Sequence, residues 1–258
     1  KKTAQEAYEM GRETIDNPLN VMWATALLEL NPESGEIVWE WHIWNHTVQD
    51  IYPELPNYGV ISDHPELFDI NRGPVGNNAG GPQGANGDWM HINAVDYNPI
   101  LDQIAISSRT QNEIFIIDHS TTSNEASGHS GGNSGMGGDF LYRWGNPENY
   151  GRGDESDRIL GNQHSINWIP AGYPGEGNLL LFNNFHEDYT SAVLEFSPPL
   201  DGNNYAIIEG ESFGPETWEW IYTGDITTPM QGGAFRLPNG NTLITQTHTA
   251  TIIEVDSE

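Results

Sequence analysis

The chain has 258 residues, and its 37 acidic residues against 9 basic ones give it a formal net charge of −28 at pH 7. Such a surface repels nucleic acid and anionic membranes, so we expect neither as a partner. No apolar run approaches the roughly 20 residues that span a bilayer, so we expect no membrane insertion. The chain has no cysteine, which excludes disulfides and thiolate metal sites.

The first residues differ in character from the rest of the chain. TAQEAYEMGRETI has helical character, and we predict a short helix or an ordered loop over residues 3–12. The opening KKTAQEAYEMGR lacks an initiator Met and resembles the middle of a longer sequence. We therefore expect the chain to be a fragment.

An internal repeat dominates the remainder. Each copy holds short runs of alternating or fully apolar residues separated by turn residues, which predicts four β-strands per copy. Four-stranded units in series predict an all-β chain, a single partial β-propeller domain over residues 1–258 with about three and a half blades. The copies span residues 91–145 and 164–224, a third over 232–256 ends after three runs, and an incomplete one occupies 24–41.

A long insertion, residues 42–90, separates the incomplete copy from the first complete one. The string NRGPVGNNAGGPQGANGD at 71–88 has no core-forming residues by our interpretation. Connections of this length without secondary structure are usually functional or disordered.

Four side chains are expected to meet at one end of the propeller channel. In a propeller the first strand of each blade lines the channel, and His91 and His164 open the first strands of consecutive copies. Arg109 ends a second strand and should reach the same end, and His46 lies in the insertion that crosses that face. Asp88, close before His91, can set the tautomer of its imidazole.

Two kinds of role remain open for these residues. A histidine that opens a strand can be purely structural, but imidazole is also a nucleophile and an acid or base near neutral pH. Imidazolium and guanidinium together stabilise tetrahedral oxyanions such as sulfate. Three histidines could bind a metal, but no HxH spacing or carboxylate-rich motif supports this, so we expect neither metal nor cofactor.

Four long strings of this chain carry a resemblance to a known family: GDWMHINAVDYNPILDQIAISSRTQNEIFIIDHST, GGDFLYRWGNP, GNQHSINWIPAGYPGEGNLLLFNN and GGAFRLPNGNTLIT. They resemble the bacterial arylsulfotransferase family. The resemblance implies a six-bladed propeller, whose N-terminal blades would be absent here. It also implies transfer of a sulfuryl group from an aryl sulfate to a phenol without the nucleotide donor PAPS, through a transiently sulfated histidine, in a protein exported to the periplasm or beyond.

The resemblance also suggests roles for single residues. His91 and His164 match two family histidines, and Arg109 matches the arginine of the SSR run. We favour His164 as the nucleophile because it stands in the tighter context of a QH pair at the start of a strand. His46 is the fourth candidate for the catalytic group.

Two departures from the family pattern favour an alternative function. After LFNN the chain continues with FHEDYT, where relatives commonly have a glycine and arginines. The next first strand begins with MQGG, at a position where a third family histidine is expected. The alternative is a non-catalytic propeller that binds an anionic aromatic compound or a glycan. A quinone-dependent dehydrogenase propeller is a third possibility, without a redox motif to support it.

Overall fold

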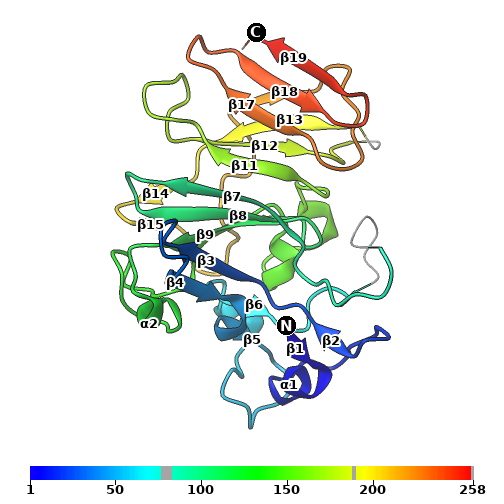
Figure 1. Cartoon of the computed structure of the whole chain (residues 1–258), viewed down its shortest axis with the longest axis vertical. Helices are drawn as coiled ribbons and strands as arrows, with labels where there is room; N and C mark the ends of the chain where they lie inside the picture. The colour runs from blue at the N-terminus through cyan, green and yellow to red at the C-terminus, as the bar shows by residue number, and fades with distance from the viewer. Residues whose placement is uncertain (77–82, 188–189, 257–258) are drawn as a thin grey trace.

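The computed structural model describes residues 1–76, 83–187 and 190–256. The chain is all-β in character, with mostly antiparallel sheets that follow one another in chain order (Figure 1). The α-helices within the described residues are short: α1 spans Ala4–Glu9, as predicted near the N-terminus, and α2 spans Ser123–Ala126. No helix in these ranges is long and apolar enough to cross a membrane.

Two four-stranded antiparallel sheets confirm the two complete copies of the repeat. Each sheet is built from strands consecutive in the chain, except that the short hairpin β14–β15 interrupts the second. The first sheet has the order β10-β9-β8-β7 and the second β11-β12-β13-β16. The strands are β7 Ile92–Asn98, β8 Gln103–Ser108, β9 Glu113–Asp118, β10 Phe140–Trp144, β11 His164–Trp168, β12 Leu179–Asn183, β13 Ala192–Phe196 and β16 Trp220–Tyr222.

Smaller sheets complete the fold. A three-stranded sheet of β17 Gly233–Arg236, β18 Thr242–Gln246 and β19 Thr251–Val255 confirms the third copy, and β3 Ala26–Leu30 pairs with β4 Ile37–His42 in the incomplete one. The remaining pairs are β1 Lys2–Thr3 with β2 Val21–Met22, β5 Thr47–Val48 with β6 Phe68–Asp69, and β14 Leu200–Asp201 with β15 Asn204–Tyr205.

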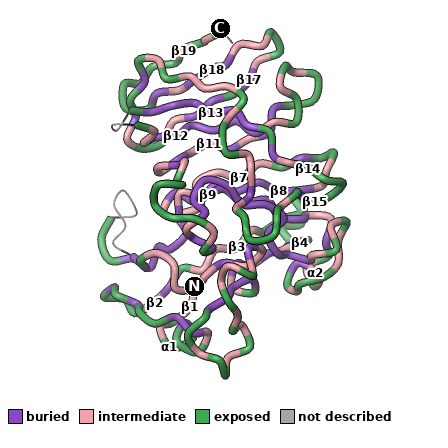
Figure 2. Tube along the Cα trace, turned by 180° about the vertical axis from the view of Figure 1, so that it is seen from behind, coloured by how far each residue is buried: buried purple, intermediate pink, exposed green. Residues whose placement is uncertain are grey.

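The alternation of strand side chains explains why the sheets lie face to face. In β8, Ile104 and Ile106 pack into one core, whereas Ala105 points to the opposite face and packs into the core shared with the second sheet. In β12, Leu179 and Leu181 likewise face the first sheet, and Leu180 and Phe182 face the third. Strands buried on both faces need apolar residues at every position. Figure 2 shows these buried stretches along the middle strands.

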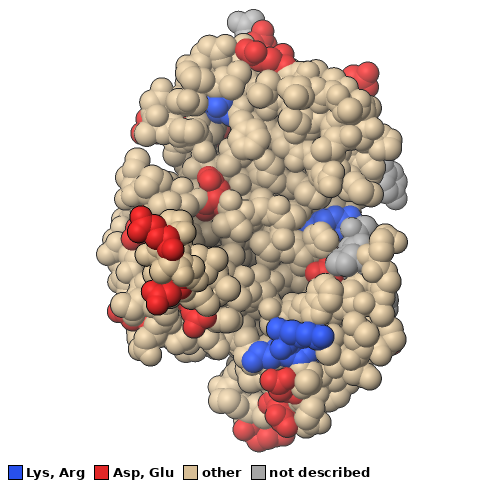
Figure 3. Space-filling model, in the orientation of Figure 1, with Lys and Arg blue, Asp and Glu red and all other residues tan. Residues whose placement is uncertain are grey.

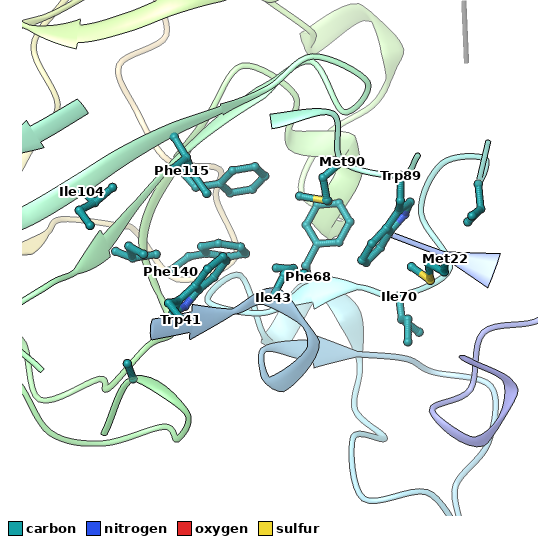
Figure 4. Packing of buried hydrophobic residues seen from close by; sticks show 14 of the residues in the cluster. Met22, Trp41, Ile43, Phe68, Ile70, Trp89, Met90, Ile104, Phe115 and Phe140 are labelled. Carbon is teal, nitrogen blue, oxygen red and sulfur yellow. The ribbon is translucent and has the colours of Figure 1, made fainter. Parts of the chain in front are cut away.

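The insertion is more ordered than its composition predicts. It contains the 3-10 turns Ile43–Asn45 and Ile61–Asp63, and its Phe68 and Trp89 pack edge to face with ring centroids 5.4 Å apart (Figure 4). The expectation that residues 71–88 hold no core residue is wrong, because Val75 is buried among these aromatic side chains. Residues 77–82 of that string lie outside the described residues.

A buried ion pair ties the first sheet to the insertion. Arg143 on β10 and Glu113 on β9 are both completely buried, and Arg143 Nε and Nη2 donate to the two carboxylate oxygens at 2.7 and 2.9 Å. Nη1 donates to the carbonyl of Leu67 at 2.7 Å, and the guanidinium lies 4.4 Å from the ring centroid of Tyr150. This fork of donors holds the insertion against the sheet through one side chain.

Candidate active site

The predicted site residues His91 and His164 lie on neighbouring strands of adjacent sheets. His91 immediately precedes β7, and His164 is the first residue of β11. Two hydrogen bonds join these strands: Asn93 Nδ2 donates to the Gln163 carbonyl at 2.7 Å, and the Trp168 amide donates to Asp96 Oδ2 at 2.8 Å. The structure therefore places both histidines at the same end of a pair of sheets, as the repeat predicted.

The imidazole of His164 is held in one tautomer. Its Nδ1 lies 2.7 Å from Asn184 Oδ1, an oxygen that can only accept, so Nδ1 carries the proton and Nε2 has the lone pair. Asn184 is buried, and its amide nitrogen donates to the carbonyls of Thr228 and Gln231, both at 2.7 Å. These two bonds determine which way the Asn184 amide faces. The backbone amide of Gln231 donates to His164 Nε2 at 3.2 Å.

Burial lowers the pKa of His164, and this is the largest effect on it. The hydrogen bond to Asn184 raises the pKa, and the charges of Arg109 and His91 lower it further. Arg109 and His91 thus contribute to the electrostatic environment of the His164 ring. Because the pKa lies below the ordinary histidine value, His164 is mostly neutral at pH 7 and keeps a nucleophilic lone pair on Nε2.

His91 has a different environment. Its Nδ1 donates to Asp88 Oδ2 at 2.7 Å, which confirms that Asp88 sets the orientation of this ring. Nε2 has no hydrogen-bond partner among the described residues, and the backbone of His91 has a φ of 46°. A non-glycine residue in the left-handed region is uncommon, and such strain often occurs at functional sites. An Asp-His pair with an open Nε2 is suited to general acid-base catalysis.

Arg109 follows the last residue of β8, where the repeat predicted it. Its backbone amide donates to the His91 carbonyl at 3.1 Å, so the turn after β8 is joined directly to the start of β7. The side chain is buried, and burial lowers its pKa, whereas the charge of Asp88 raises it. Arg109 therefore brings a positive charge to the end of the sheets where His91 lies.

A cavity of about 410 Å³ opens beside His164, between the first strands of three consecutive sheets. Asn93 and Asp96 line it from β7, and Gln231 and Phe235 line it from the third sheet. A larger cavity of about 590 Å³ lies beside Trp144 in another part of the described chain, and its lining contains no histidine. Other cavities of the described residues are lined by His64, His129 or His119, so the cavity beside His164 is the candidate substrate site because it contains His164, although His91 and Arg109 do not line it.

The structure does not bring His46 to this group. Its side chain is completely buried, with Nδ1 2.7 Å from Asp139 Oδ1 and Nε2 2.9 Å from the Ala126 carbonyl. The ring stacks on Trp41 with centroids 5.6 Å apart. The insertion does pass this side of the sheet, but the backbone turns the His46 side chain inward to the core.

Sequence reasoning missed Asn184, although the repeat contains the indication. Arg109 follows the second strand of its sheet, and Asn184 follows the second strand of the next one. Asn184 is the last residue of the LFNN string, so the amide that orients His164 directly precedes the place where we expected arginine. Beyond it, His186 packs edge to face on Trp218, with ring centroids 5.5 Å apart, as a structural residue.

The titration of His164 can be predicted from this arrangement. NMR titration of the His164 Cε1 proton should give a pKa below the ordinary value of about 6.5, and Arg109→Ala should raise it because a repelling charge is lost. The unfolded chain then binds the proton first, so the free energy of unfolding should decrease as the pH falls from about 6.5 through the lowered pKa. An unchanged His164 titration in Arg109→Ala would contradict the proximity of the two side chains.

Comparison with protein families gives a match to the arylsulfotransferase (ASST) family over residues 22–197. A search of curated proteins gives no match. The matched region contains His91, Arg109 and His164, together with the first four-stranded sheet and the strands β11, β12 and β13 of the second. Since this match covers well over half of the chain, the protein belongs to the arylsulfotransferase family.

Proposed function

We propose that the protein transfers a sulfuryl group from an aryl sulfate to a phenol through a sulfohistidine at His164. The observation that carries this proposal is the tautomer of His164: Asn184 holds the proton on Nδ1, and Nε2 keeps a lone pair beside Arg109 and His91. A neutral nucleophile next to a guanidinium suits attack on a sulfate ester, because the cation offsets the charge on the sulfuryl oxygens.

In the first step, His164 Nε2 attacks the sulfur atom of the donor. The N–S bond forms as the bond between sulfur and the aryl oxygen breaks, and the leaving aryloxide takes a proton from Nε2 of the His91 imidazolium. Asp88, 2.7 Å from Nδ1, stabilises that imidazolium and orients its ring. Arg109 stabilises the sulfuryl oxygens during the transfer.

In the second step, the acceptor phenol gives its proton to the now neutral His91 Nε2. The phenol oxygen attacks the sulfur, the S–N bond breaks, and His164 Nε2 recovers its lone pair. His91 returns to the imidazolium, so the cycle consumes one aryl sulfate and one phenol and leaves the protein unchanged. Dividing the transfer into two displacements lowers each barrier.

We further propose that the sheets are blades of a β-propeller. Three features support this: the four-stranded units follow one another in the chain, their first strands β7, β11 and β17 adjoin, and His91 and His164 lie at the starts of β7 and β11. Figure 3 shows acidic side chains in several separate groups on one face, so a small anionic aryl sulfate does not meet a single block of negative charge there.

Export to the periplasm or beyond is proposed from the family alone.

The direct experiment is an acceptor-dependent transfer assay. The protein is incubated with 4-nitrophenyl sulfate, with and without phenol, and the release of 4-nitrophenol is followed. We expect release that depends on phenol, parallel lines in double-reciprocal plots, and a sulfuryl adduct on the peptide that contains His164 when donor is given alone. Transfer without any such adduct would contradict the covalent route.

The alternative is a non-catalytic protein that binds an anionic aromatic compound. One observation favours it: the backbone amide of Gln231 donates a hydrogen bond to His164 Nε2, the atom that would attack the aryl sulfate. Binding of 4-nitrophenyl sulfate, measured by calorimetry, without release of 4-nitrophenol would support this alternative. Absence of binding would contradict both functions.

The role of Asp88 leads to a further prediction. Asp88→Asn removes the charge that stabilises the His91 imidazolium, so proton donation to the leaving group should weaken. We expect kcat to decrease by about 10²-fold or more with phenyl sulfate, which has a basic leaving group, and much less with 4-nitrophenyl sulfate. Equal decreases for both donors would indicate a structural role for Asp88 instead.

A further inference from the structure

A second cluster of histidine and carboxylate side chains lies outside the proposed active site. It consists of His46, which follows the 3-10 turn Ile43–Asn45, His129 in the glycine-rich loop after α2, and Asp139 just before β10. One ligand atom from each residue lies within 4.8 Å of the other two. The three residues come from segments far apart in the sequence, which the fold brings together.

The hydrogen bonds of His46 leave an acceptor atom facing a carboxylate. Its Nε2 lies 2.9 Å from the Ala126 carbonyl, which can only accept, so Nε2 carries a proton. In the neutral ring Nδ1 then has a lone pair, yet it lies 2.7 Å from Asp139 Oδ1. Two acceptor atoms at this distance need a proton or a cation between them, and a cation that binds both atoms supplies that attraction. An imidazole whose other nitrogen donates to a carbonyl is the usual arrangement of a metal-bound histidine.

His129 converges on the same carboxylate. Its Nδ1 lies 2.8 Å from Asp139 Oδ1 and 3.1 Å from Oδ2, so two imidazole nitrogens from different segments approach one carboxyl group. Asp139 is buried, whereas the His129 side chain is 61% exposed. His129 also lines a cavity of about 490 Å³, which provides a path for an ion and room for a water ligand.

The surroundings keep His46 in the geometry that a ligand requires. Its ring stacks on Trp41 with an interplanar angle of 2°. The chain also passes close to this ring at Gly138, where an added Cβ would lie 2.7 Å from His46 Nε2. The stacking on Trp41 and the contact of Nε2 with the Ala126 carbonyl keep Nδ1 directed to Asp139. Preorganised ligands of this kind favour metal binding.

We propose that His46 Nδ1, His129 Nδ1 and the Asp139 carboxylate bind one zinc ion. Two imidazoles and one carboxylate are ligands that zinc accepts at about 2.0–2.2 Å, with a fourth position for water. Binding replaces the direct contact between His46 Nδ1 and Asp139 Oδ1 with one bond from each of them to the cation. The ion would join the insertion to the glycine-rich loop 127–138 and so stabilise both.

The test uses the whole chain after treatment with a chelator. Titration with ZnCl₂ by calorimetry should show one ion bound per chain, and CoCl₂ should produce the visible absorption bands of a low-symmetry Co²⁺ site. His129→Ala should weaken zinc binding by at least about 100-fold while the far-UV circular dichroism stays unchanged, because His129 is exposed. Asp139→Asn should weaken it comparably.

His64→Ala is the matched control, because His64 lines the same cavity but is not one of the three ligands. This variant should bind zinc like the parent. A chain that binds no zinc, or a His129→Ala variant with the affinity of the parent, would overturn the proposal. If the chain binds no zinc, the contact between His46 and Asp139 is a buried ion pair instead. The result is independent of sulfuryl transfer, since no ligand of this site belongs to the proposed catalytic group.

Discussion

Replacing His164 with alanine should decrease phenol-dependent release of 4-nitrophenol by at least about 10³-fold, because the proposed covalent intermediate forms on its Nε2. The free energy of unfolding should change little, since His164 lies at the edge of a cavity and not in one of the cores. Asn184→Ala should give a smaller decrease, because it frees the tautomer and the orientation of His164 but leaves the nucleophile in place.

Chemical rescue separates a nucleophile from a structural histidine. In His164→Gly, added imidazole should restore part of the release, because it can occupy the vacated space and accept the sulfuryl group. His42→Ala serves as the control, since His42 is also partly exposed but lies outside the site, in contact with Glu40. If His164→Ala retains the rate of the parent, or if His42→Ala loses as much activity, the assignment of His164 is wrong.

Replacing Arg143 with leucine should lower the free energy of unfolding by about 3–5 kcal/mol, because the carboxylate of Glu113 would remain buried without its partner. The variant also loses the bond to the Leu67 carbonyl and the stacking on Tyr150. Arg143→Lys should be destabilising as well, because an ammonium cannot reproduce the fork that reaches both carboxylate oxygens.

Urea unfolding followed by tryptophan fluorescence measures this change, with the slope checked for equality between variants. Arg158→Leu is the control, because Arg158 pairs with Glu155 at 4.0 Å on the surface, and such pairs contribute at most about 1 kcal/mol. Similar urea midpoints for Arg143→Leu and the parent would contradict the claim that this ion pair holds the insertion to the sheet.

The repeating sheets could be predicted because each copy carries its own turns and apolar runs. The equivalent starts of β7 and β11 follow from counting strands, and this alone placed His91 and His164 together. Arg109 followed in the same way from the end of β8. Such positional arguments work wherever a side chain sits at a strand terminus, because the repeat fixes which termini share one end of the sheets.

The insertion could not be predicted in this way, because no repeat constrains it. Whether His46 points to the cavity or to the core depends on its packing against Trp41 and on the carbonyl of Ala126, which lies 80 residues further along the chain. The contact between His46 and Asp139 joins segments 93 residues apart. A cluster assembled from such contacts has no local spacing in the sequence, so a search for HxH motifs misses it.

The hydrogen bond from Gln231 to His164 has a kinetic consequence. While the backbone amide of Gln231 is in place, it occupies the lone pair on His164 Nε2. The segment around Gln231, whose carbonyl accepts a hydrogen bond from Asn184, must therefore move before an aryl sulfate can react. The observed rate constant for sulfation then equals the intrinsic one multiplied by the fraction of molecules in which the segment is open. If opening is slow, turnover becomes insensitive to the leaving group and depends on solvent viscosity instead.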